Sequence, residues 1–254
     1  ELSISFKWEQ LENKIDKISI IRQIFYRLPY TLRSILWLFR YLFLRWPLKG
    51  AGLDEWRKTP SKTTFVSYLF NLAPNAIEKG EFESRYWTSL PNMLKNSTTN
   101  WLHLYFSSSE LPDARTARDI IKKFNKTYEG VQVHTTLDSF LSMERIYVVL
   151  KYYYKLKSKQ KFLQSLLEIT AGIYWPLLAK DCKDSISGNT AISNLLYLSL
   201  FESAMSTLPC QENGVYLQEN QGWEFALTHY WHVNHGNKLI GWAHSTSRFW
   251  DLRY

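Results

Sequence analysis

The sequence predicts an α/β fold in which helices cover both faces of a mainly parallel sheet. Three observations predict it. The chain is 45% hydrophobic, which supports a core, and short β-rich runs alternate with helical runs. Polar clusters directly follow several apolar runs, as they do at the carboxyl ends of strands in open sheets. Five strands joined by right-handed crossovers form a Rossmann-like domain.

The first expected element is a basic amphipathic helix bracketed by two prolines. Residues 17–49 contain seven basic residues, no acidic residue and many large apolar side chains. Arg33, Ser34 and Arg40 fall on one helical face, and the wide remainder is apolar. This pattern is typical of an interfacial membrane anchor. The expected membrane-surface residues are Arg33, Arg40, Arg45, Trp37 and Trp46. The alternative is a helix that packs against its own domain.

A polar linker at residues 54–62 precedes the alternating elements. The five expected strands are rich in β-branched and aromatic residues and end at turn residues; they span 63–70, 100–106, 131–135, 215–218 and 239–243. The expected helices lie near 82–95, 114–126 and 224–233, and across 140–208 with interruptions near Pro176 and at 184–189. We therefore expect a helical, basic amphipathic segment at 1–52 and a Rossmann-like domain at 53–254.

Charge and motifs narrow the possible functions. A net charge of +8 favours an anionic partner, such as nucleic acid, anionic lipid or a phosphorylated small molecule. The sequence lacks the Gly-rich loops of dinucleotide and P-loop sites and the nucleophile elbow of hydrolases. It also lacks any RNA-binding or helix-turn-helix signature, so nucleic acid is not the expected partner. Two cysteines without metal spacing indicate a reducing compartment. His229, His232 and His235 lie three apart, but no nearby Cys or Asp completes a metal site, so no metal is expected.

Two polar clusters follow the fourth and fifth expected strands and define the candidate site. Glu219 is a candidate general base or hydrogen-bond acceptor, and His244 a candidate base or oxyanion donor. The candidate substrate-binding residues beside them are Asn220, Gln221, Trp223, Ser245, Thr246 and Arg248. The alternatives are a capped turn with a structural histidine and, for Trp223, packing in the core. Glu224 fits an acidic residue at a helix N-terminus, stabilised by the helix macrodipole, better than Glu219 does.

A third polar cluster follows the third expected strand. It contains His134, Thr135, Thr136, Asp138 and Ser139. Asp138 is a further candidate substrate-binding residue, and its alternative role is a helix N-cap. All three clusters are expected on one edge of the sheet, because parallel strands point their carboxyl ends the same way.

The run Tyr216-Leu-Gln-Glu-Asn-Gln-Gly-Trp-Glu224 and the run Leu239-Ile-Gly-Trp-Ala-His-Ser-Thr-Ser-Arg-Phe-Trp-Asp-Leu-Arg-Tyr254 resemble bacterial surface-carbohydrate biosynthesis proteins. These proteins, of O-antigen, lipopolysaccharide or capsule synthesis, are of the glycosyltransferase-B type. Segments 65–71, 82–87 and 100–105 are also similar, so the resemblance covers most of residues 30–254.

The resemblance implies an amino-terminal, acceptor-side domain of a two-domain glycosyltransferase, with Glu219 and His244 facing the cleft. A carboxyl-terminal domain would bind the nucleotide-sugar donor. It is missing here, so this chain needs no cofactor of its own and is expected to be inactive alone. The expected partners are a glycan or lipid-linked acceptor and the anionic membrane surface, at the cytoplasmic face of the cytoplasmic membrane. The alternative function is a non-catalytic module that binds membrane or another anionic polymer.

Overall fold

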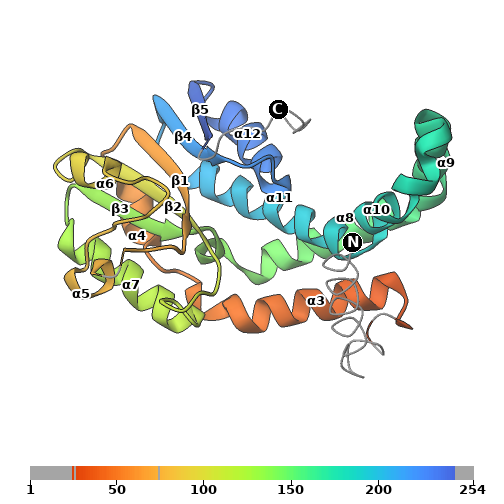
Figure 1. Ribbon diagram of the computed structural model, residues 1–254, viewed down its shortest axis with the longest axis horizontal. Helices are drawn as coiled ribbons and strands as arrows, with labels where there is room; N and C mark the ends of the chain where they lie inside the picture. The colour runs from red at the N-terminus through yellow and green to blue at the C-terminus, as the bar shows by residue number, and fades with distance from the viewer. Residues whose placement is uncertain (1–24, 26, 74, 244–254) are drawn as a thin grey trace, which may run out of the picture.

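The computed structural model describes residues 25, 27–73 and 75–243. They form an α/β fold around one five-stranded, entirely parallel sheet, and the predicted Rossmann-like class is confirmed (Figure 1). The strands are β1 (Thr63–Leu69), β2 (Thr99–Tyr105), β3 (Gln132–Thr136), β4 (Asn213–Gln218) and β5 (Lys238–Ala243). Each predicted strand is present, with its ends shifted by at most two residues.

The strand order is β3-β2-β1-β4-β5. The chain builds the sheet in one direction from β1 to β3 and then crosses back to place β4 on the other side of β1. The order therefore reverses between β1 and β4, which is the point where open α/β sheets bind ligands at the carboxyl edge. β4 pairs with β5 so that Gln218 lies opposite Ala243.

Helices close to the sheet are α4 (Leu53–Lys58), α5 (Ala76–Lys79), α6 (Leu90–Met93), α7 (Ala114–Thr127) and α12 (Gly222–Asn234). Of the helix predicted near 82–95, only Leu90–Met93 is helical, and the prediction is wrong for the rest. Phe82 and Trp87 pack into the core from irregular backbone, and Leu72 and Ser84 form an isolated antiparallel bridge. Pro91 lies in the first turn of α6, because proline is tolerated there but interrupts a helix interior.

The core has one layer on each face of the sheet. On one face, Trp101 of β2 stacks on Phe65 of β1 and contacts Phe82. On the other face, Tyr68 of β1 contacts Trp223 of α12, which in turn stacks on Phe201. The two layers follow from the strand geometry, since successive side chains point to opposite faces.

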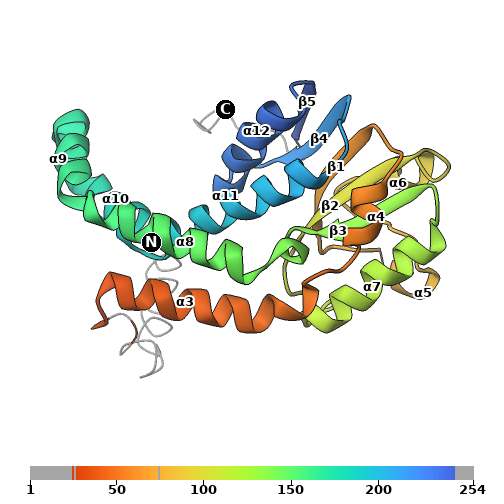
Figure 2. The same ribbon diagram turned by 180° about the vertical axis from the view of Figure 1, so that it is seen from behind.

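A helical arm extends away from the sheet between β3 and β4 (Figures 1 and 2). It contains α8 (Met143–Ser158), α9 (Gln160–Ala171), η3 (Gly172–Tyr174) and α10 (Trp175–Ser187). The segments that join it to the sheet are η2 (Leu137–Phe140) and α11 (Asn189–Thr207), and Phe140 and Phe201 of these segments are buried in the core. The breaks before Pro176 and at Gly188 match the predicted interruptions.

Helix α3 (Tyr30–Arg45) lies along this arm and leads through η1 (Trp46–Leu48) into the sheet domain (Figure 1). Ser34, predicted on the polar surface, is buried and donates a hydrogen bond to the carbonyl of Ser187. Leu38, Leu48 and Ala51 belong to the same core as the sheet. The division predicted at residue 52 therefore does not separate two cores; residues 1–24 lie outside the described part of the chain.

Candidate functional site

Two neighbouring pockets lie at the carboxyl edge of the sheet. The first, here called the switch-point pocket, has a volume of about 490 Å³. It is lined by Tyr68 at the end of β1, by Phe70 and Glu219 directly after β1 and β4, and by residues of α11. The second, the arginine pocket, has a volume of about 300 Å³ and lies beyond β2 and β3. Phe106 and Tyr197 line both pockets, so the two share a wall.

Glu219 is positioned by a buried tyrosine in the switch-point pocket. The hydroxyl of Tyr68 donates to Oε2 of Glu219 at 2.6 Å and accepts from Nε1 of Trp223 at 3.2 Å. Burial raises the pKa of Tyr68, and the hydrogen bond to Glu219 raises it further. Tyr68 therefore remains a neutral donor at physiological pH, and its hydrogen bond holds the Glu219 side chain in place.

Glu224 holds the loop that carries Glu219. Its Oε1 accepts from the backbone N–H of Glu219 at 2.9 Å and of Gln221 at 2.8 Å. Gln221 and Glu224 form a capping box at the start of α12. Glu224 therefore lies in the first turn of α12, as predicted, and the capping box is an additional role; Gln221, although it lines the pocket, serves as the helix N-cap.

The loops after the two switch-point strands share an uncommon backbone conformation. Asn71, after β1, has φ 53°, and Asn220, after β4, has φ 57°. Asparagine tolerates this left-handed region better than most residues, and such conformations concentrate at ligand sites. Nδ2 of Asn220 is buried and has no hydrogen-bond partner among the described residues.

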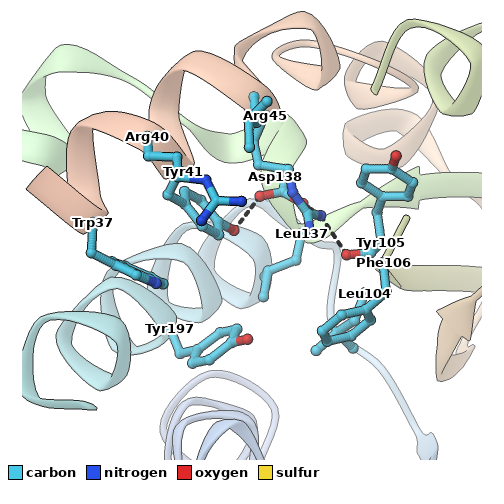
Figure 3. A pocket seen from close by; sticks show the side chains of 11 residues that line it. Trp37, Arg40, Tyr41, Arg45, Leu104, Tyr105, Phe106, Leu137, Asp138 and Tyr197 are labelled. Carbon is cyan, nitrogen blue, oxygen red and sulfur yellow. Dashed lines mark hydrogen bonds and ion pairs between the residues drawn. The ribbon is translucent and has the colours of Figure 1, made fainter. Parts of the chain in front are cut away.

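The arginine pocket is built around an ion pair between the half-buried Arg45 and the buried Asp138 (Figure 3). Nη1 of Arg45 lies 3.2 Å from Oδ2 of Asp138 and also donates to the carbonyl of Tyr105, while the Tyr41 hydroxyl donates to Oδ1 of Asp138. The Arg45 guanidinium lies 4.3 Å from the ring centre of Tyr105 and 6.0 Å from that of Phe106. Burial raises the pKa of Asp138, and Arg45 counteracts that rise.

This geometry corrects the prediction that Arg45 is a membrane-surface residue. Its charge is directed inward to a carboxylate that is distant in sequence. Trp37 stacks on Tyr41 at 5.2 Å and lines the arginine pocket. Arg40 is exposed at the mouth of that pocket and forms no ion pair with a described residue.

The other two predicted membrane-surface residues differ in exposure. Trp46 is exposed, with Nζ of Lys49 4.9 Å above its ring. Arg33 is half-buried and lies over the ring of Tyr30 at 4.1 Å. The outward face of α3 instead carries an apolar stripe, here called the α3 stripe: Leu32, Leu36, Phe39 and Phe43.

Two other sequence predictions change. Trp223 is only 3% exposed and packs between Phe201 and Tyr68, so it supports the pocket from below and does not present a face for a sugar. His134 is wholly buried within β3, and Thr135 and Thr136 also belong to the strand. Of the third polar cluster predicted from the sequence, only Asp138 therefore lines a described pocket.

The structure assigns no metal site to the described residues: no group of three His, Cys, Asp or Glu side chains converges there. His232 instead bonds the carbonyl of Thr228, and His229 packs on Tyr230.

The second half of the predicted site, His244, Ser245, Thr246 and Arg248, lies outside the described residues. The strands that precede the two clusters are nonetheless neighbours, because Gln218 and Ala243 are paired at the ends of β4 and β5. The predicted closeness of His244 to Glu219 stays a prediction.

The site residues that sequence reasoning missed are mainly tyrosines. Tyr41, Tyr68 and Tyr197 come from α3, β1 and α11, and each contributes to a pocket wall. Aromatic residues are abundant throughout the sequence, and nothing in their local spacing distinguishes these three. The one available signal was the alternation in β1, which places Tyr68 on the same face as Val66.

We compared the chain with protein-family models, curated proteins and solved structures, and none of them matches it.

Proposed function

We propose that this protein is the acceptor-side part of a glycosyltransferase-B type enzyme of bacterial surface-polysaccharide synthesis, with its acceptor at the carboxyl edge of the sheet. The observation that carries the proposal is the Glu219 carboxylate, held by Tyr68 at the point where the strand order reverses. This is where a Rossmann-like sheet exposes its loops to a ligand.

The chemistry around Glu219 suits a hydroxylated ligand. Carboxylate, amide and hydroxyl groups from Glu219, Asn194 and Thr190 line the switch-point pocket beside the aromatic rings of Phe70 and Phe106. Sugars present hydroxyl groups at their edges and apolar C–H groups on their faces, and this lining offers partners for both. A few placed polar groups within a largely apolar wall are typical of small-molecule sites.

In the proposed reaction the acceptor hydroxyl attacks the anomeric carbon of a nucleotide sugar, and the nucleotide leaves. Glu219 orients that hydroxyl and accepts its proton. Tyr68 keeps the carboxylate in place. The donor belongs to a further domain of the full-length protein, and His244 remains a second candidate for the base or for stabilising developing charge.

The proposed acceptor is lipid-linked and lies at the cytoplasmic face of the cytoplasmic membrane. The α3 stripe is exposed along one side of α3, and Arg40 of the same helix stands at the mouth of the arginine pocket. An anionic headgroup at Arg40 would place an attached glycan near the shared wall of the two pockets. The arrangement supports an acceptor that is partly in the bilayer and partly in the site.

The test is complementation in a strain that lacks this gene, with the cell-surface polysaccharide ladder resolved on gels. Glu219→Gln is expected to lose or shorten the ladder at unchanged protein level, because loss of a general base costs roughly 10²–10⁴-fold in rate. Glu212→Gln is the matched control, because Glu212 is exposed at the opposite end of β4. A normal ladder with Glu219→Gln would refute the catalytic role of Glu219.

The second candidate is a non-catalytic module that binds membrane or another anionic polymer. It is favoured by the α3 stripe with Arg33 and Arg40 beside it. The complementation assay separates the two candidate functions. A binding module loses function when Arg33 and Arg40 are replaced by Glu, but keeps it when Glu219 is replaced by Gln.

A further inference from the structure

The far end of the helical arm is a hairpin of two short helices. α9 and α10 are joined at η3, where Gly172 adopts φ 52° and the chain reverses. Figures 1 and 2 show α9 at the end of the arm most distant from the sheet. The hairpin therefore projects from the body of the protein and contributes nothing to the two pockets.

The hairpin exposes most of its apolar side chains. No residue of α9 is buried, and Ile169, Ile173 and Leu177 are 80%, 87% and 78% exposed. Residues 169–179 contain no charged residue. Further exposed apolar residues of the hairpin are Phe162, Leu166, Leu167, Tyr174 and Leu178. A soluble protein rarely leaves so continuous an apolar surface in water unless something covers it.

The charges that flank the hairpin indicate which kind of partner covers its apolar surface. Lysines flank the uncharged tip on both sides, at Lys155, Lys157, Lys159 and Lys161 before it and at Lys180 and Lys183 after it. Across 155–183 only Glu168 and Asp181 oppose these six lysines. An apolar tip with basic flanks matches an anionic bilayer, whose headgroups attract lysine while its acyl chains accept the tip. Tyr174 and Trp175, at the reversal, are residue types enriched at the membrane interface.

Length decides between crossing the bilayer and entering one side of it. The segment Gln160–Ser187 is long and apolar enough to span a membrane by length and composition, and none of its most apolar window is buried. The reversal at η3, however, divides it into helices of 12 and 13 residues. Each is about 18–20 Å long, well short of the ~30 Å hydrocarbon core. The hairpin can therefore enter only one leaflet, and both of its ends stay on the same side.

We propose that the α9–α10 hairpin is a monotopic membrane anchor whose tip, Ile169–Leu177, inserts into one leaflet of an anionic bilayer. It is separate from the α3 stripe and goes beyond the sugar-transfer proposal, since it does not involve Glu219. A protein held at two places, α3 and the hairpin, would keep a fixed orientation on the membrane.

The first test is co-sedimentation of the whole chain with phosphatidylcholine vesicles that contain 30% phosphatidylglycerol or none. The hairpin variant carries three substitutions, Ile169→Ser, Ile173→Ser and Leu177→Ser. It is expected to bind the anionic vesicles at least about 40-fold more weakly than the wild type. This factor assumes that the three aliphatic side chains each lose half of the free energy of transfer from water into the bilayer. The matched control, Met93→Ser, Phe225→Ser, Val233→Ser, removes three similarly exposed apolar residues outside the arm and is expected to bind like the wild type. A third variant, with Ser at Leu32, Phe39 and Phe43, measures the separate contribution of α3.

A second measurement locates the tip. An environment-sensitive fluorophore is attached at Ile173→Cys after Cys182 and Cys210 are replaced by Ser, and at Phe225→Cys as control. Anionic vesicles are expected to shift only the Ile173 label to shorter wavelength and to expose it to lipid-borne quenchers. Wild-type affinity in the hairpin variant would overturn the proposal, as would an unshifted label. A concentration-dependent dimer that the hairpin substitutions abolish, without vesicle binding, would also overturn it and assign the surface to a second copy.

Discussion

The buried histidine pair predicts a strong loss of stability in mild acid. Nε2 of His103 lies 3.0 Å from Nδ1 of His134, and both rings are fully buried on adjacent strands. Phe82, Trp101 and Phe124 surround them. The two remaining ring nitrogens are buried and have no hydrogen-bond partner among the described residues. This environment holds both imidazoles neutral, because a buried charge without a partner is costly.

The magnitude follows from the pKa shifts. Burial lowers the pKa of His103 to about 3, and burial together with the neighbouring ring lowers that of His134 well below its ordinary value. The unfolded chain binds these protons near pH 6.5, whereas the folded chain does not, so stability is present above pH 6.5 and is lost as pH falls below it. At pH 5 the shift of His103 alone has removed about 2 kcal/mol, out of the 5–15 kcal/mol typical of a domain, and His134 adds a loss of the same sign.

The assay is urea unfolding between pH 7.5 and pH 5, followed by far-ultraviolet circular dichroism. His103→Phe is expected to remove about 2 kcal/mol of the pH dependence, and His103→Phe with His134→Phe is expected to remove more than that. The exposed His232→Gln is the control and is expected to leave the pH profile unchanged. In the wild type, imidazole proton resonances of the pair should not titrate above pH 5. Equal pH dependence in the wild type and the double variant would refute the reasoning.

Three further predictions concern the ion pair, a glycine and the cap. Asp138→Ala is expected to cost about 3 kcal/mol in urea unfolding because it leaves Arg45 without its buried partner, whereas Asp138→Leu with Arg45→Met should be close to neutral; equal losses would contradict this. Gly52→Ala should lower stability by at least ~3 kcal/mol, since φ is 72° and the new Cβ would meet a carbonyl oxygen of β3 at 2.2 Å. Gly50→Ala, with φ 82° and open space, should cost only about 1 kcal/mol, and thermal unfolding of the two glycine variants measures the difference. Glu224→Ala should cost ~1 kcal/mol through loss of the cap, and an unchanged melting temperature would contradict this.

Local sequence was sufficient to predict those elements whose sequence pattern depends only on neighbouring residues. The β-branched and aromatic run of β1 and the basic, periodic run of α7 were recognised at nearly their observed bounds. The capping role of Glu224 was also recoverable, because a capping box spans only four residues. The failure over most of 82–95 has another origin, because the burial of Phe82 and Trp87 depends on strands elsewhere in the chain.

The candidate site shows the limit of such reasoning. Glu219 was found because a carboxylate directly after a strand must lie at the sheet edge. Arg45 was assigned to a membrane surface because amphipathic spacing cannot reveal a carboxylate 93 residues away. His134 was included both in the expected strand at 131–135 and in the polar cluster at the sheet edge, and its pairing opposite Trp101 of β2 places it inside the sheet.

The sequence by itself determined the α/β class, the five strands and the edge on which Glu219 lies, because these depend on periodicity and on the common direction of parallel strands. Only the tertiary structure decided the strand order, and with it the reversal between β1 and β4 that places Tyr68 against Glu219. It also decided that the helices between β3 and β4 leave the sheet as an arm, so that their apolar residues face outward at Ile169 and Ile173. The physical reason is that hydrophobic burial is non-directional: an apolar pattern requires a partner, and only packing selects which one.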